Sequence, residues 1–434
     1  MSIYWQMLQS IKPFWASDLQ NRYFRLIGFS RFMPFPLALK QHYAYAFETS
    51  KWRALPLAFV VLLGACGTSK QLPDAGTTAP GPDQAASTQR SAAVLEMPIV
   101  TRLSQFECAS ELPLKQRAGQ LMFPLVTQSE FSQASELAST GSLGGVVVLG
   151  SPDASIRQDI ANYQKRSLFG PGIIAVDEEG GRVQRLSKLT TRMPSAQKVA
   201  AVFDPGEARQ LAANHALAIG DLGFTMNLAP VADLNNSPAI GDRAFGRDPA
   251  EVTAFAMATA NGIIDSGLVP VLKHFPGHGR ASDSHHSLPL IPGVDVLQNT
   301  DLVPFKEVSG RNDIPIMMGH LVVNGLTDGQ PASVSPQAVD GLLRGELGFD
   351  GLVMTDAFNM DAISATMDNA EAAERAIAAG VDLVMLSSLE DADTALKRVV
   401  SAVGNGRISD ESITESFVRV MQTRAIDVCE LPNS

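Results

Sequence analysis

The stretch Val269–Leu288 reads V-P-V-L-K-H-F-P-G-H-G-R-A-S-D-S-H-H-S-L and decides how the rest of the chain is interpreted. Its first four residues form a short apolar run typical of a buried β-strand, and at Lys273 the run changes to polar residues. Four of the seven histidines fall in this stretch, and Pro276 with the glycines on either side of His278 excludes a helix. We therefore predict a strand that ends in a loop of proton carriers, which is where barrel enzymes hold their active sites.

Length and composition place the chain among ordinary folded proteins. Its 434 residues are 45% hydrophobic and 18% charged, enough for one large domain or two smaller ones. The formal net charge of −11 and the lack of a basic tract exclude nucleic acid as a partner. Three cysteines, Cys66, Cys108 and Cys429, are too few for a disulfide scaffold and lack metal-ligand spacing. Outside the cytoplasm, Cys108 and Cys429 could pair and join the two ends of the folded domain.

Residues 51–66 have the features of a secretory signal. The run 54–65 is apolar, follows Lys51 and Arg53, and is too short to cross a bilayer, which takes about 20 residues. It ends in the sequence L-G-A-C at Cys66, which resembles the lipobox of bacterial lipoproteins. The resemblance implies cleavage before Cys66 and lipidation of its thiol.

The segments on either side of this signal are not expected to fold into domains. Residues 67–100 are rich in Gly, Ser, Thr, Pro, Ala and Gln, which predicts a flexible, disordered linker. Residues 1–50 form an atypical N-terminal extension, and two interpretations stay open for it. A start codon placed too far upstream, with Met33 as an internal start, is one, and a long cleaved leader is the other.

From Arg102 onward, short apolar runs alternate with longer stretches of helical period. Eight runs are expected to be strands: 119–126, 144–149, 172–176, 224–228, 269–272, 314–318, 351–354 and 381–386. Five candidate helices lie at 155–167, 205–218, 249–266, 370–379 and 409–424. Because the runs are continuously apolar, they favour parallel strands covered on both faces. Residues 101–434 are therefore predicted to form a single α/β domain, a (β/α)8 TIM-type barrel. A doubly wound open sheet is the alternative, but its glycine-rich phosphate turn is missing.

Polar side chains follow the apolar runs at the points where the predicted strands end. They are Asp177 to Arg185 after the third run, Asp233 and Arg243 after the fourth, Lys273 and His274 after the fifth, His320 after the sixth and Asp356 after the seventh. Each of these could be a structural ion pair taken singly. All of them on one rim of one barrel favour an active site.

Three chemistries compete for these residues. A metal site at His274 and His278 is disfavoured. Histidines four residues apart bind a metal when they lie on a helix, and the proline and two glycines of this segment prevent a helix. A serine hydrolase is disfavoured because the chain has no G-x-S-x-G turn. Glycoside hydrolysis fits best, since Asp356 can act as nucleophile and His285, with Asp283 two residues before it, as an oriented acid/base. No metal and no cofactor are expected.

The sequence K-H-F-P-G-H-G at 273–279, followed by D-S-H at 283–285, resembles the signature of bacterial β-N-acetylglucosaminidases of glycoside hydrolase family 3. Further segments resemble motifs of that family in the same order: 177–185, 243–246 and 353–357. The similarity covers roughly residues 110–425. It implies a (β/α)8 barrel and a retaining mechanism through a covalent glycosyl-enzyme intermediate.

Carried over by position, the resemblance makes Asp356 the nucleophile and His285 the acid/base, with Asp283 as its dyad partner. The residues expected to hold a terminal N-acetylglucosamine are Asp177, Arg185, Arg243, Lys273 and His274. Charged side chains of these types suit the hydroxyls of a sugar. Supporting or structural roles are expected for Arg182, His278, His286 and His320.

Two positions depart from the family pattern. Glu178 stands where the family commonly has Gln or His, and we expect it to alter the charge near the sugar. The loop between Gly279 and Asp283 is one residue shorter than in the family, so the reach of His285 is in question. The chain after Leu386 is too short for the second domain that supplies a glutamate acid/base in many relatives, which implies a proton donor from the barrel itself.

The resemblance and the lipobox together predict a lipid-anchored exo-β-N-acetylglucosaminidase at the periplasmic face of a bacterial membrane. Gly67 after the lipidated cysteine favours the outer membrane. The expected substrates are muropeptides or chitin fragments that end in N-acetylglucosamine, and a monomer is favoured. An N-acetylglucosaminide phosphorylase and a non-catalytic sugar-binding lipoprotein are the alternative functions. A mechanism that uses the acetamide of the substrate as nucleophile is also open.

Overall fold

The computed structural model describes residues 99–284 and 288–431. The N-terminal extension, the lipoprotein signal with Cys66 and nearly all of the linker lie outside the described residues. His285 and His286 also lie outside them. Within the described part of the chain, no helix has the length and hydrophobicity needed to span a membrane.

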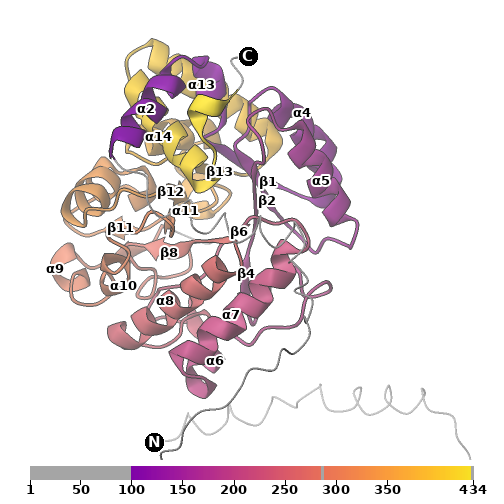
Figure 1. The fold of residues 1–434 in the computed structure, drawn as a ribbon. Coiled ribbons are helices and arrows are strands. Elements are labelled where there is room, and N and C mark those ends of the chain that lie inside the picture. Colours follow the sequence, from indigo (N-terminus) through magenta and orange to yellow (C-terminus); the bar gives the residue numbers. More distant parts are fainter. Residues whose placement is uncertain (1–98, 285–287, 432–434) are drawn as a thin grey trace, which may run out of the picture. The chain divides into compact units, whose positions relative to one another are not determined.

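The fold is α/β, with short parallel strands at the centre and helices around them (Figure 1). One sheet has the order β13-β1-β2-β3-β6-β7 and a second has the order β12-β10-β8. Their bounds are β1 Met122–Val126, β2 Gly145–Val148, β3 Ile173–Val176, β6 Met226–Asn227, β7 Val269–Pro270, β8 Leu272–Phe275, β10 Ile316–Met318, β12 Val353–Thr355 and β13 Val384–Leu386. Every pairing within these two sheets is parallel, as the continuously apolar runs predict.

Single bridges adjoin the edges of the two sheets. Val231, which follows β6, pairs with Lys273 of β8, and Met354 of β12 pairs with Leu383 just before β13. The strand side chains separate into two buried groups. One group contains side chains from both sheets, including Phe123, Val147, Met317, Met354 and Met385. The other and larger group packs between the strands and the helices.

The helices follow the strands in the order that the sequence predicts. Their bounds are α2 Ile99–Ser110, α3 Leu114–Gly119, α4 Phe131–Ser139, α5 Ile156–Arg166, α6 Ala196–Val202, α7 Pro205–Gly220, α8 Pro249–Asp265, α9 Val294–Leu297, α10 Val303–Lys306, α11 Asp361–Ser364, α12 Asn369–Ala378, α13 Leu389–Gly404 and α14 Asp410–Thr423. The 3-10 and π turns are η1 Gln128–Glu130, η2 Gly241–Arg243, η3 Ala332–Val334, η4 Gln337–Glu346 and η5 Val428–Glu430. Helix α7 illustrates how capping residues set the first residue of a helix. Asp204 accepts the Glu207 N–H at 2.9 Å, Glu207 accepts the Asp204 N–H at 3.0 Å, and Pro205 occupies the first turn.

Four details differ from the predicted elements. The run predicted as one strand at 269–272 is divided between β7 and β8, and β8 continues to Phe275, so Lys273 and His274 lie within a strand. Gly119 closes helix α3 instead of starting the first strand. The predicted third run is followed by an antiparallel hairpin, β4 (Glu178–Gly180) with β5 (Val183–Gln184), and a small parallel pair joins β9 (Leu290–Ile291) to β11 (Val322–Val323). These extra strands are two or three residues long, too short for alternation of hydrophobicity to mark them.

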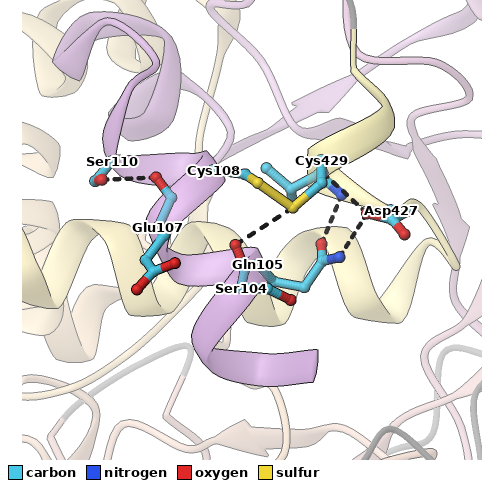
Figure 2. Close-up of a disulfide and its surroundings, with 8 residues drawn as sticks. Ser104, Gln105, Glu107, Cys108, Ser110, Asp427 and Cys429 are labelled. Carbon is cyan, nitrogen blue, oxygen red and sulfur yellow. Dashed lines mark hydrogen bonds between the residues drawn. A yellow bond between two sulfur atoms is a disulfide. The ribbon is translucent and has the colours of Figure 1, made fainter. Parts of the chain in front are cut away.

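A disulfide joins the two ends of the described domain. Cys108 of α2 and Cys429 of η5 are bonded, with a Cα–Cα distance of 5.2 Å and a sequence separation of 321 residues. Figure 2 shows Gln105 beside this bond: its side chain donates to Asp427 at 2.5 Å and accepts the Val428 N–H at 2.6 Å. The pairing considered from the sequence is therefore confirmed.

Candidate active site

A pocket of about 190 Å³ opens where the carboxyl ends of the parallel strands meet. Seven of the eight candidate catalytic and binding residues line it: Asp177, Arg185, Arg243, Lys273, His274, Asp283 and Asp356. The eighth, His285, lies outside the described residues. Residues that are up to 179 positions apart in the sequence are thus brought to one rim, as expected when polar residues follow successive parallel strands.

Glu179, which the sequence alone does not single out, joins the cations of the pocket. Its carboxylate accepts two hydrogen bonds from Arg243, at 2.7 and 2.8 Å, and lies 2.6 Å from the Lys273 ammonium. Lys273 also donates to Asp177 at 2.7 Å. The result is a compact cluster of two carboxylates and two cations, in which Glu179 fixes the positions of both cations.

Glu178 points the other way, which corrects the expectation that it alters the charge near the sugar. Its carboxylate lies 3.1 Å from His215 Nε2 on α7 and accepts the Leu186 N–H. Neighbouring residues of an extended segment face opposite sides, so Asp177 and Glu179 both face Lys273 and Glu178 does not. That alternation is the signal in the sequence that could have identified Glu179.

Charge pairing keeps this cluster ionised in spite of burial. Burial opposes the charge of Lys273, but Asp177 and Glu179 hold the pKa of its ammonium above the ordinary value. For Glu179, burial is outweighed by Lys273 and Arg243, which hold the pKa of the carboxyl well below its usual range. Asp177 differs, because burial raises its pKa more than Lys273 lowers it. Asp177 is therefore the member of the cluster that protonates most readily.

Asp356 lies directly after β12 with its carboxylate facing the pocket. Its backbone N–H donates to the Met318 carbonyl at 2.9 Å, and Oδ1 accepts the Ala357 N–H at 2.8 Å. His274 Nε2 lies 3.9 Å from Oδ2. Burial alone would raise the pKa of Asp356, but the neighbouring His274 and the Ala357 N–H hold it below the ordinary value. The carboxylate is thus ionised at neutral pH, the state that a nucleophile requires.

His320 supports the segment that carries Asp356, as the expectation of a structural role predicts. It is fully buried, with Nε2 3.1 Å from the Ala357 carbonyl and Nδ1 2.8 Å from the Ser333 hydroxyl. Since a carbonyl only accepts, Nε2 carries the proton and Nδ1 accepts from Ser333. Burial lowers the pKa of His320, so the ring is neutral and fixes Ala357.

The loop that leads to Asp283 is tied down at both ends. At its base, Arg280 donates to the buried Asp301 at 2.7 Å. At its tip, the Ser284 hydroxyl lies 3.1 Å from His278 Nε2, and the Ser284 carbonyl accepts the Ala362 N–H at 3.2 Å. His278 thus has the loop-supporting position expected of it. Although the loop is short, Asp283 lines the same pocket as Asp356.

Two arginines near the pocket have different surroundings. Arg182 pairs with Asp242 and donates to the Ile240 carbonyl at 2.9 Å, so it supports the turn that precedes Arg243, as expected. The Arg185 guanidinium lines the pocket, and none of the residues that the structure describes pairs with it. Arg185 is therefore available to a ligand. No group of three or more His, Cys, Asp or Glu side chains within 99–284 and 288–431 is arranged to hold a metal ion.

Comparison with known proteins identifies relatives over most of the folded domain. Residues 113–423 match the family model described as Glycosyl hydrolase family 3 N terminal domain. A relative named Beta-hexosaminidase LpqI, from Mycobacterium tuberculosis, is 41% identical over 261 residues, which cover 58% of this chain and 67% of that protein.

Solved structures of the same family are also similar to this chain. A glycosyl hydrolase of the GH3 family from Mycobacterium smegmatis superposes with a TM-score of 0.69 at 35% identity, covering 73% of this chain and 98% of that one. A glycoside hydrolase family 3 beta-N-acetylglucosaminidase from Paenibacillus superposes with a TM-score of 0.69 at 34% identity, covering 73% of this chain and 63% of that one.

Proposed function

Since this chain belongs to glycosyl hydrolase family 3, we propose that it is a retaining, exo-acting β-N-acetylglucosaminidase. The family resemblance and the prediction of a glycoside hydrolase are confirmed. Relatives named beta-hexosaminidase support the β-N-acetylhexosaminidase class. The observation that carries the specific proposal is that Asp356, held ionised at a strand end, shares one pocket with Asp283 and with the cluster around Lys273.

In the proposed first step, Asp356 attacks the anomeric carbon while the acid/base protonates the leaving oxygen. The low pKa of Asp356 supports this role, because the attack needs the carboxylate. The product of the step is a covalent glycosyl–Asp356 ester. Water then displaces the sugar, and the acid/base takes the proton of that water, so two inversions give net retention.

We assign the acid/base to the pair of Asp283 and His285. Asp283 lines the pocket, and His285 follows two residues later in the chain. A carboxylate beside an imidazole fixes its tautomer and stabilises its charged form, which suits both donation and abstraction near neutral pH. The Ser284 contacts to His278 and Ala362 support the placement of this loop against the pocket.

The terminal sugar is proposed to bind against Asp177, Lys273, Arg243 and His274, with Arg185 in the same pocket. Glu179 holds the two cations of the cluster at fixed positions, so they need not reorganise when the sugar hydroxyls arrive. Arg185, which none of the described residues pairs, is proposed to contact the polar substituents of the substrate.

We further infer that the two parallel sheets form a single (β/α)8 barrel. The bridges Val231–Lys273 and Met354–Leu383 adjoin their edges at both sides. A buried cluster with side chains from both sheets supports a common interior. The doubly wound alternative would leave two open edges, and its phosphate turn is missing from the sequence.

The lipid anchor and the periplasmic location remain proposals based on the L-G-A-C sequence at Cys66. With an anchor there, substrates would be N-acetylglucosamine-ended muropeptides or chitin fragments, and the linker 67–100 would separate the catalytic domain from the membrane. Replacing Cys66 with Ser should move the protein from the membrane to the soluble fraction. Retention of Cys66→Ser in the membrane fraction would overturn the anchor.

The test of the proposed function is kinetic and uses a chromogenic N-acetylglucosaminide. Asp356→Ala should lose activity on the order of 10⁴-fold, since the nucleophile is removed. Asp265→Asn is the matched control, because Asp265 pairs with Arg209 on the surface, away from the pocket. An Asp356→Ala protein that cleaves at the wild-type rate would contradict the assignment.

Three further measurements separate the alternatives. A fluorinated N-acetylglucosaminide should label Asp356, whereas catalysis by the substrate acetamide would leave the protein unlabelled. Release that accelerates in phosphate buffer, with sugar 1-phosphate as product, would indicate a phosphorylase. Binding of N-acetylglucosamine without turnover in any buffer would indicate a sugar-binding protein.

A further inference from the structure

Asp233 is a buried carboxylate behind the pocket wall, and the proposed mechanism does not use it. It follows a short segment that pairs with β8: Val231 bridges to Lys273, and the Ala232 N–H donates to the Lys273 carbonyl at 2.7 Å. This pairing sets Asp233 beside His274. Its side chain is 0% exposed, so its charge must be balanced by protein groups alone.

All the neighbours that Asp233 contacts are donors. Oδ2 lies 2.6 Å from His274 Nδ1, while Oδ1 accepts the His278 N–H at 2.6 Å and the His274 N–H at 3.3 Å. Burial opposes its ionisation, but His274 and His278 hold the pKa of Asp233 below the ordinary value. Asp233 is therefore a charged acceptor that binds both the ring and the backbone of the K-H-F-P-G-H segment.

This contact determines how His274 faces Asp356. Because Nδ1 points at a carboxylate, it carries a proton, and the ring can present only Nε2 to the pocket. Nε2 lies 3.9 Å from Asp356 Oδ2. The other titratable group packed against the ring is His278, with ring centroids 5.8 Å apart, and its pKa is lowered by burial. His274 is thus held between two carboxylates, with a neutral ring at its side.

We propose that Asp233 is a positioning residue for glycoside cleavage, which acts by fixing the tautomer and orientation of His274 toward the nucleophile Asp356. This rests on the proposed function, since it concerns the same site. The three side chains form a buried series in which His274 lies between Asp233 and Asp356. Asp233 does not contact the substrate, and its whole effect passes through the imidazole.

Asparagine tests this role sharply because Asp233 accepts at both oxygens. An amide has one acceptor, so Asp233→Asn must turn its NH2 either toward the His274 Nδ1–H or toward the His278 N–H. Either orientation loses one hydrogen bond, while the shape of the side chain stays nearly unchanged. We expect kcat/KM to fall on the order of 10- to 100-fold, by analogy with the loss when the hydrogen-bond partner of a metal-ligating histidine is removed.

A double-mutant cycle distinguishes positioning from general support of the fold. If Asp233 acts through His274, then Asp233→Asn in a His274→Asn background should lower kcat/KM by less than about 2-fold further. The control is Asp382→Asn, since Asp382 is equally buried but pairs with Arg344 and Arg419 away from the pocket. Its effect should add fully to that of His274→Asn. Full additivity for Asp233→Asn would overturn the proposal.

The second readout depends neither on activity nor on a substitution at Asp233. Nitrogen-15 NMR of the histidine-labelled wild-type protein should show His274 Nδ1 protonated through a strong hydrogen bond, with the signal identified by its loss in His274→Asn. A His274 Nδ1 with a free lone pair would overturn the proposal even if Asp233→Asn fails to fold. Activity of the wild-type protein on the chromogenic substrate is measured separately. Loss of the proposed function can therefore be distinguished from loss of the positioning role of Asp233.

Discussion

Glu179 binds two cations of the pocket at once, so its replacement has a specific expected effect. Glu179→Gln keeps the shape but weakens the contacts to Arg243 and Lys273, each of which contributes roughly 1.5–3 kcal/mol as a charged hydrogen bond. We expect kcat/KM to fall about 10- to 100-fold, mainly through a higher KM, because the binding cluster loosens. Steady-state kinetics measures this.

The neighbouring residue provides the control. Glu178→Gln alters a buried contact with His215 on the opposite face, so it should lower the melting temperature and change KM by less than about 2-fold. Equal effects of the two substitutions on KM would contradict the assignment of Glu179 to the pocket.

The lowered pKa of Asp356 predicts the acid side of the pH profile. As the proposed nucleophile, Asp356 would react only as the carboxylate, so labelling by a saturating fluorinated N-acetylglucosaminide should decline as pH falls through its pKa. Because that pKa is held below the ordinary value, the midpoint should lie below about pH 3.9. Enzyme held at each pH and assayed again at neutral pH controls for unfolding, and a midpoint above about pH 5 in stable enzyme would contradict the prediction.

At the scale of residues, the sequence predicts which side chains reach the rim but not how they connect. Lys273 and Asp356 could be found because charge follows directly after an apolar run. Glu179 was missed because it adjoins an identical residue, and only the extended conformation of β4 separates their directions. Asp233 could be placed near the rim, but its partner His274 is 41 positions away and meets it only through strand pairing.

The loop 277–284 is the element on which the proposed proton delivery depends. Gly277 is required at its start, since φ is +123° and a Cβ would lie 2.5 Å from the Cβ of Asp301. The sequence predicts the loop from its Pro and Gly residues but not its two attachments, because Arg280–Asp301 and Ser284–His278 depend on tertiary packing. The strands and five of the helices, in contrast, were predictable from local pattern and caps, whereas α13 was not among the predicted helices.

Removing the tip attachment tests the role of this loop. Ser284→Ala loses the contact with His278, worth about 1 kcal/mol, so proton donation should become slower by roughly 5-fold. The loss should appear with an alkyl or sugar leaving group and vanish with dinitrophenol, which departs without protonation. Ser282→Ala, an exposed neighbour in the same loop, is the control. Equal losses on both substrates would show that Ser284 acts on something other than proton transfer.

At the scale of the whole molecule, the disulfide closes the described domain on itself. It joins α2 to η5, and Gln105 and Asp427 add hydrogen bonds next to it (Figure 2). From the sequence, the number of cysteines and an expected location outside the cytoplasm suggested that Cys108 and Cys429 could pair. Only the structure, in which the two ends of the domain lie close together, establishes the bond. Closure of a 321-residue loop restricts the unfolded chain more than a short crosslink does.

Loss of this bond should therefore weaken the fold without affecting the chemistry. Cys429→Ser, or reduction of the wild-type protein, should lower the free energy of unfolding by about 2–5 kcal/mol, as measured by reversible urea denaturation. Activity at 25 °C should stay unchanged, because neither cysteine lines the pocket. Cys108→Ser should have the same free energy of unfolding as Cys429→Ser, and a reducing agent should not lower it further in either variant. A wild-type midpoint that is insensitive to reduction, under conditions where free thiols appear, would show that Gln105 and Asp427 hold the ends together without the covalent bond.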